Sequence, residues 1–166
     1  MSLPDWNAFL KADAAIAALV GNRIYPLLIP HHVYNSVTQH PVIVFQRIGA
    51  QRTANYCGTE RIVVASYQFD CYARRYETTL ELAEAVRLAL RDYVGLIGDC
   101  RIRLMRQETE IELLDPEPGL FRVSSDWSVW YIEGASETEE PPVSGDVTAD
   151  SSLIFADSTL YTADAS

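Results

Sequence analysis

Residues 61–74, RIVVASYQFDCYAR, alternate between apolar and polar side chains along most of their length. The apolar positions are Val63, Ala65, Tyr67, Phe69 and Cys71, and the polar ones between them are Ser66, Gln68 and Asp70. Because successive side chains of a strand point to opposite faces, this pattern predicts a strand with one buried face. Such a strand needs a second layer to cover that face, so the chain is expected to fold in layers.

Two segments have the spacing of amphipathic helices. Residues 77–95 place apolar side chains on one face, with glutamates leading and arginines following, which suits the helix dipole. Residues 4–20 place Phe9, Ile16 and Val20 on one stripe and are followed by a Gly-Asn stop. Each segment is therefore predicted to be one helix.

Three more segments are predicted to be strands. They are residues 41–49, which are rich in β-branched side chains, residues 100–114 and residues 120–134. The polar residues 49–60 are predicted to form a long hairpin loop, and residues 115–119 a turn. The predicted fold class is α+β, an antiparallel sheet of about four strands with two helices packed on one face.

The composition changes after Gly134. Residues 1–133 are predicted to form the folded domain, residues 134–148 an acidic Pro/Ser linker, and residues 149–166 a short arm with two similar units, ADSSLIF and ADSTLYT. The arm has too little apolar surface to fold alone. Two interpretations stay open: an acidic tail without fixed structure, or two turn-strand units that pair with another surface.

The net charge of −10 argues against sequence-specific nucleic-acid binding, which needs a basic surface. Seven acids and no Lys or Arg lie in residues 134–166. No apolar run approaches the ~18 residues of a membrane span, and the N-terminus lacks a basic secretory region. We therefore expect neither a membrane partner nor export from the cytoplasm in which the protein is made.

All three histidines, His31, His32 and His40, lie within HHVYNSVTQH. A metal site or a general-base cluster would need them to converge, but adjacent residues on an extended chain point to opposite sides. No Asp, Glu or Cys lies between residues 26 and 56 to complete a ligand set. The segment is therefore predicted to be a polar loop without a metal.

The sequence contains no set of residues that predicts catalysis. Nucleophile elbows, phosphate loops, dinucleotide fingerprints and zinc-protease motifs are all absent, so no enzyme activity or cofactor is expected. The three cysteines make no disulfide framework and are predicted to be reduced and packed as small apolar residues. Glu108, Glu110 and Glu112 alternate on one predicted strand and are interpreted as solvated acids on one face.

The order of these segments resembles the tail completion, or tail terminator, family of long-tailed bacteriophages and prophages. The resemblance covers about residues 5–133 and depends on the motifs GNRIYP, HPVIVFQRIG, YQFDCYAR and LFRVSSDWSVWY. It implies an α+β virion protein that assembles as a ring, usually a hexamer, on the head-proximal end of the tail tube. The implied partners are copies of itself, the tail tube protein and a head–tail connector protein.

The contacts of such a ring are predicted from the residues with free backbone groups and mobile polar side chains. The predicted interface residues are Gln51, Arg52, Thr53, Asn55, Tyr56, Arg101 and Arg103. Rival functions are another head–tail connector, a tail tube subunit and a small ligand-binding α+β domain. The first two also predict oligomers, whereas the third predicts a pocket with convergent polar groups.

Overall fold

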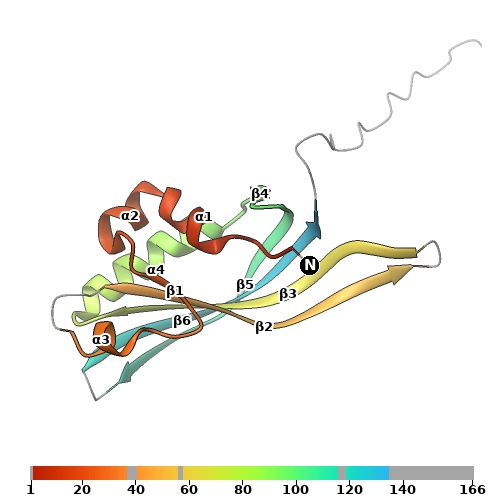
Figure 1. Cartoon of the computed structure of the whole chain (residues 1–166). Coiled ribbons are helices and arrows are strands. Elements are labelled where there is room, and N and C mark those ends of the chain that lie inside the picture. Colours follow the sequence, from red (N-terminus) through yellow and green to blue (C-terminus); the bar gives the residue numbers. More distant parts are fainter. Residues whose placement is uncertain (1, 37–40, 56–57, 116–118, 135–166) are drawn as a thin grey trace, which may run out of the picture.

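The computed structural model of the protein describes residues 2–36, 41–55, 58–115 and 119–134. Its strands form one sheet in the order β1-β2-β3-β6-β5-β4 (Figure 1). The strands are β1 (Ile24–Pro26), β2 (Val42–Asn55), β3 (Gly58–Ala73), β4 (Gly95–Ile97), β5 (Cys100–Asp115) and β6 (Leu120–Glu133). The helices are α1 (Trp6–Ala12), α2 (Ala14–Val20), α3 (His31–Tyr34) and α4 (Tyr76–Leu90).

The predicted fold class is wrong. The sheet has six strands in the described part of the chain and is mixed, because β1 pairs parallel to β2. Its long strands curve into a half-barrel, and most of the regular structure is strand (Figure 1). The four-stranded antiparallel prediction failed because β1 and β4 have only three residues each, too few to show an alternating pattern.

The four long strands account for the half-barrel. β2 pairs antiparallel with β3, β3 with β6, and β6 with β5. The predicted strands 61–74, 100–114 and 120–134 are confirmed to within a few residues at either end. Register shifts in the β2–β3 and β5–β6 pairs mark bulges, which increase local twist and so help the sheet to curve.

The core lies between one face of the sheet and the layer formed by α1, α2 and α4, which Figure 1 shows on the same side. The apolar positions predicted on β3 all face this core, because Val63, Ala65, Tyr67, Phe69 and Cys71 are buried. On β6, Val123, Trp127, Val129 and Tyr131 are also buried. The two-residue period of the sequence therefore identified the buried face correctly.

The predicted single helix over residues 4–20 is two helices. Asp13 has an extended backbone, with φ −76° and ψ 123°, and its carboxylate accepts hydrogen bonds from the backbone amides of Ala15 and Ile16. Asp5 caps α1 in the same way through the amide of Ala8. Each aspartate satisfies amides at a helix start, so α2 begins where the first helix ends.

The predicted loop over residues 49–60 is also largely wrong. β2 continues to Asn55 and β3 begins at Gly58, so the segment is mainly a two-stranded ribbon that projects beyond the helical layer (Figure 1). Its polar sequence misled the prediction, because strands that are paired through their backbones need no apolar alternation. Backbone pairing such as Ala54 with Thr59 maintains the strands instead.

The outer face of the sheet, opposite the helical layer, is partly covered by residues 27–36. This segment includes α3, and the side chain of Val33 is buried. The predicted linker and C-terminal arm, from residue 135 onward, lie outside the described residues. Within the described part of the chain, none of the helices has the length and apolar character needed to cross a bilayer.

Candidate assembly surface

The sheet has two free edges, which we call the β2 edge and the β5 edge. The β2 edge comprises residues 46–52, since β1 pairs only with Ile43–Phe45. The β5 edge comprises residues 104–115, since β4 pairs only with Cys100–Ile102. No described strand pairs with either segment on its outer side. Unpaired strand edges present backbone donors and acceptors to other chains.

The β5 edge also exposes apolar side chains. Leu104 is 49% exposed, Ile111 54% and Leu114 57%, and Trp130 on the neighbouring strand is 44% exposed. Charged residues are interleaved, because Arg106, Glu108, Glu110 and Glu112 are exposed along the same strand. A long edge with this much exposed apolar surface is expected to be covered in an assembly.

The predicted interface residues of the ribbon lie on or beside the β2 edge. Gln51 and Arg52 are exposed residues of the edge itself. Arg52 is also engaged within its own chain, because its Nη2 lies 2.9 Å from Oε1 of Glu133. Thr53 and Asn55 belong to β2, but their side chains, like all of Tyr56, lie outside the described structure. These residues remain predictions as contacts.

Arg101 and Arg103 lie at the start of β5, where a bulge separates them. Arg101 pairs with Ile132, whereas Arg103 is the extra residue between Ile102 and Leu104. A second bulge at Glu108 breaks the predicted row of glutamates: Glu110 and Glu112 share the helix-facing side, and Glu108 is the unpaired residue. Bulges shift side chains by one position, which a strict two-residue period cannot anticipate.

The histidine segment differs in part from the predicted loop. His31 and His32 lie in α3, a single turn of helix, and the His31 ring is hydrogen-bonded to the Asn35 side-chain amide at 3.1 Å. His40 lies outside the described residues. Among the residues that are described, no three His, Cys, Asp or Glu side chains gather as metal ligands.

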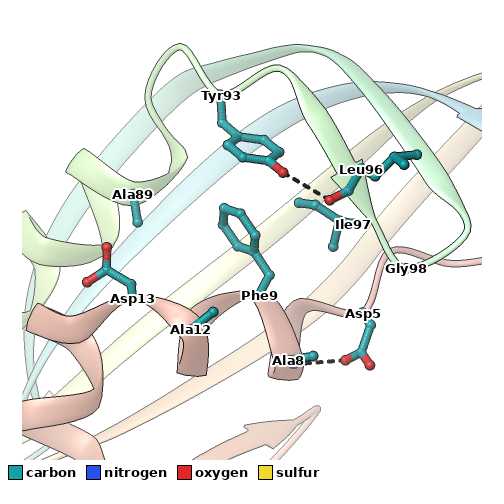
Figure 2. Close-up of a pocket in the computed structure, with 10 residues that line it drawn as sticks. All are labelled: Asp5, Ala8, Phe9, Ala12, Asp13, Ala89, Tyr93, Leu96, Ile97 and Gly98. Atoms are coloured by element: carbon teal, nitrogen blue, oxygen red, sulfur yellow. Dashed lines mark hydrogen bonds between the residues drawn. The ribbon is translucent and has the colours of Figure 1, made fainter. Parts of the chain in front are cut away.

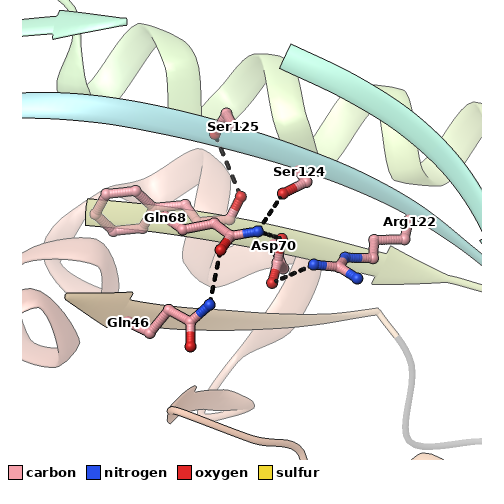
Figure 3. Close-up of polar contacts among 7 residues, drawn as sticks. Gln46, Gln68, Asp70, Arg122, Ser124 and Ser125 are labelled. Carbon is pink, nitrogen blue, oxygen red and sulfur yellow. Dashed lines mark hydrogen bonds and ion pairs between the residues drawn. The ribbon is translucent and has the colours of Figure 1, made fainter. Parts of the chain in front are cut away.

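A polar network lies on the outer face of the sheet, across the three strands β2, β3 and β6 (Figure 3). Gln46 donates to Gln68, and Gln68 donates to Ser124 at 2.6 Å and to Asp70 at 3.2 Å. Nη2 of Arg122 lies 3.0 Å from Oδ2 of Asp70, whose side chain is only 6% exposed. Each of these five side chains has at least one partner in the network, which therefore links the strands across their outer face and helps to fix their register.

A hollow lies on the helical side, between α1 and the segment that follows α4 (Figure 2). It has a volume of about 570 Å³ and includes Phe9 and Tyr93, whose rings pack edge to face at 4.7 Å. Its two carboxylates, Asp5 and Asp13, are helix caps, and the Tyr93 hydroxyl donates to the carbonyl of Leu96. The lining groups therefore serve structure, and they form no acid–base pair.

Cys71 and Cys100 are free and buried, which confirms the sequence prediction for these two residues. Burial, followed by the charge of Asp70, raises the pKa of the Cys71 thiol well above its usual range. Burial also raises the pKa of Cys100 to about 11, with Glu133 and Asp99 adding to the effect. Since the thiolate is the reactive form, neither group is suited to nucleophilic chemistry.

We therefore predict slow thiol labelling in the folded protein. In a Cys57→Ser variant at neutral pH, Cys100 should react with a disulfide reagent about a hundredfold or more slowly than free cysteine, and Cys71 more slowly still. Absorbance of the released thiol would follow the reaction, and denaturant should expose two thiols per chain. Labelling of Cys100 within seconds, without denaturant, would contradict this burial.

Comparison with known proteins agrees with a role in assembly. The family model described as "Tail completion protein gp17" matches residues 7–132, which is most of the chain. The chain belongs to this tail completion family. Membership of the gp17 family makes the protein a structural component of a bacteriophage-type tail, and the resemblance stated from the sequence is confirmed.

A solved structure shares the fold of this gp17-family chain. A chain of a structure titled "Virion of native gene transfer agent (GTA) particle" is similar at a TM-score of 0.59 and 18% identity. The similarity covers 75% of this protein and 90% of that chain. No curated protein sequence matches significantly. Tail proteins act by association, so the free edges, rather than the hollow in Figure 2, form the candidate functional surface.

Proposed function

We propose that the protein caps the phage tail tube as a homo-oligomeric ring and joins the tube to the head. The observation that carries this proposal is the match to the tail completion family over residues 7–132. A subunit of such a ring needs two different contact surfaces, one for each neighbour. The β2 edge and the β5 edge lie on opposite sides of one sheet and meet that requirement.

The ring contacts follow from the nature of these edges. A head-to-tail interface joins one surface of a subunit to a different surface of the next, and it closes when the rotation between subunits allows. Gln51 and Arg52 of the β2 edge, together with Arg101 and Arg103 near the β5 edge, are proposed to contact neighbouring subunits or the tube. Thr53, Asn55 and Tyr56 at the end of the ribbon are proposed to do the same.

The net charge of −10 suits a conduit for DNA. Phosphate groups bind to clustered lysine and arginine side chains, and an acidic wall repels them. We propose that the channel of the ring carries part of this acidic surface. DNA would then pass without being retained, which a protein at the joint between head and tail requires.

The assembly state of the purified protein tests this proposal. Light scattering and electron microscopy should give one closed ring, either alone or at one end of purified tail tubes. Adding the protein should also stop further growth of the tubes. A monomer that never binds tubes would contradict the proposal, and so would tubes that keep growing.

The alternative function is that of a tail tube subunit, because free strand edges would equally allow copies of the protein to associate into a tube. Such a subunit would form long polymers by itself at concentrations where a terminator stops at a discrete ring. A different head–tail connector would form a ring but leave tube growth unchanged. The same microscopy experiment therefore separates all three roles.

A further inference from the structure

We propose that the β2 edge of one copy pairs antiparallel with the β5 edge of the next copy, so that one sheet continues through the ring. This inference rests on the proposed ring and names the surfaces that close it. The occupant of each edge is a second copy of this chain, because the two edges complement each other in direction, height, shape and charge.

Direction is set by the three antiparallel pairs that separate the edges. β2, β3, β6 and β5 alternate in direction, so β2 and β5 run oppositely within one subunit. Rotation about a ring axis along the strands keeps every strand direction. The β2 edge therefore meets the neighbouring β5 edge antiparallel, in the same geometry as every long pair within the subunit.

We use height for the position of a residue along the strand direction. The pairing register of the four long strands shows which residues of the β2 edge have the same height as which residues of the β5 edge. The connected rows are Arg47–Tyr67–Trp127–Gln107, Ala50–Ala65–Val129–Met105 and Gln51–Val64–Trp130–Leu104. Residues 47–51 of the β2 edge and residues 104–107 of the β5 edge therefore have the same height along the strands. β1 and β4 end before this shared height, so they leave both segments open to a neighbour.

Shape complementarity is found on the outer face. Gly49 has no side chain and, with Gln51, Val64 and Ser66, lines an open hollow of about 420 Å³ beside the β2 edge. Leu104, half exposed, lies on the outer face of the β5 edge in the same row as Gln51. Antiparallel pairing at equal height would place the leucine of one copy against the hollow of the next.

Charge complementarity is found on the helix-facing side. Nη1 of Arg47 is buried and has no hydrogen-bond partner among the described residues. Gln107 lies level with Arg47, and its amide donates to Oε2 of Glu110 at 2.7 Å. The carboxylate of Glu110 is thus held beside the position that faces Arg47 of the next copy. An ion pair between them would give a partner to this guanidinium, whose Nη1 the described residues of its own chain leave unsatisfied.

Charge reversal tests the pairing. Arg47→Glu and Glu110→Arg should each raise the subunit concentration needed for half-maximal ring formation by about tenfold or more, and the double variant should restore ring formation. Native mass spectrometry, or light scattering with tail tubes present, gives the readout. Arg75→Glu is the matched control for Arg47→Glu, because this exposed arginine lies away from both edges and its reversal lowers the net charge by the same amount.

Cysteine cross-linking provides a second measurement that does not depend on loss of assembly. In a Cys57→Ser background, the pair Gln51→Cys and Leu104→Cys should oxidise to a ladder of covalent oligomers, because opposed residues in paired strands approach within disulfide distance. Each single replacement should give at most a dimer. The thermal melt of every variant shows whether it folds.

The outcomes separate this inference from the proposed function. A wild-type ring that persists in both charge-reversed variants, with no ladder from the cysteine pair, would overturn the edge pairing while leaving the ring. A wild-type chain that forms no ring, alone or on tubes, would overturn the proposed function and this inference with it. Rescue by the double variant supports both.

Discussion

Replacing Trp6 with alanine is expected to lower the free energy of unfolding by about 3–5 kcal/mol. Trp6 is 1% exposed at the start of α1, and its ring packs edge to face against Tyr67 at 5.0 Å and Phe69 at 5.3 Å. It therefore joins the helical layer to the central strand of the half-barrel. Removal of the indole would leave a cavity that the curved sheet can fill only in part.

Denaturant unfolding followed by circular dichroism would measure this change. Trp130→Ala is the matched control, because Trp130 is 44% exposed on the outer face of the sheet and its loss should cost less than about 1 kcal/mol. Equal costs for the two tryptophans would show that the layer formed by α1 does not stabilise the sheet as described.

The elements that could be predicted from the sequence are those whose apolar residues are spaced so that one face packs against the core. β3 and β6 alternate because one face meets the core, and α4 has its apolar stripe for the same reason. The break at Asp13 was missed because the apolar spacing continues through it. Its signal was present, since an aspartate followed by a run of alanines is a favoured helix N-cap.

The remaining elements depend on backbone pairing and not on side-chain pattern. β1 and β4 are recognisable only from the strands they pair with, and the ribbon at residues 49–60 has a polar sequence without apolar alternation. Since neither case requires apolar alternation, the prediction reduced the sheet to about four strands and treated the ribbon as a loop.

The places of the predicted interface residues in the sheet follow only in part from the sequence. Gln51 and Arg52 do lie on a free edge, whereas the bulges at Arg103 and Glu108 move side chains away from the positions that simple alternation gives. Arg47 was missed altogether. Its signal was an arginine within the apolar segment PVIVFQRIG, a placement that costs free energy unless another group pairs with it.

Replacement of Arg122 with methionine is expected to destabilise the protein by about 2–4 kcal/mol. Its guanidinium is the cationic partner of Asp70, which is buried on the outer face in the network of Figure 3. Without it, the carboxylate of Asp70, which is 6% exposed, would have the Gln68 amide as its one remaining side-chain partner among the described residues. The expected cost is below that of a fully buried pair, because the Arg122 side chain is 24% exposed.

A double-mutant cycle with Asp70→Asn separates the ion pair from the packing of the arginine. The double variant should be less destabilised than Arg122→Met alone, since the uncompensated charge is removed. Arg87→Met is the control: its partner Glu84 lies on the exposed side of α4, and breaking that pair should leave the free energy of unfolding nearly unchanged. Chemical denaturation at neutral pH gives the four free energies. If the effects of the two replacements simply added, Asp70 and Arg122 would not be coupled, and the network would not be what holds β3 and β6 in register.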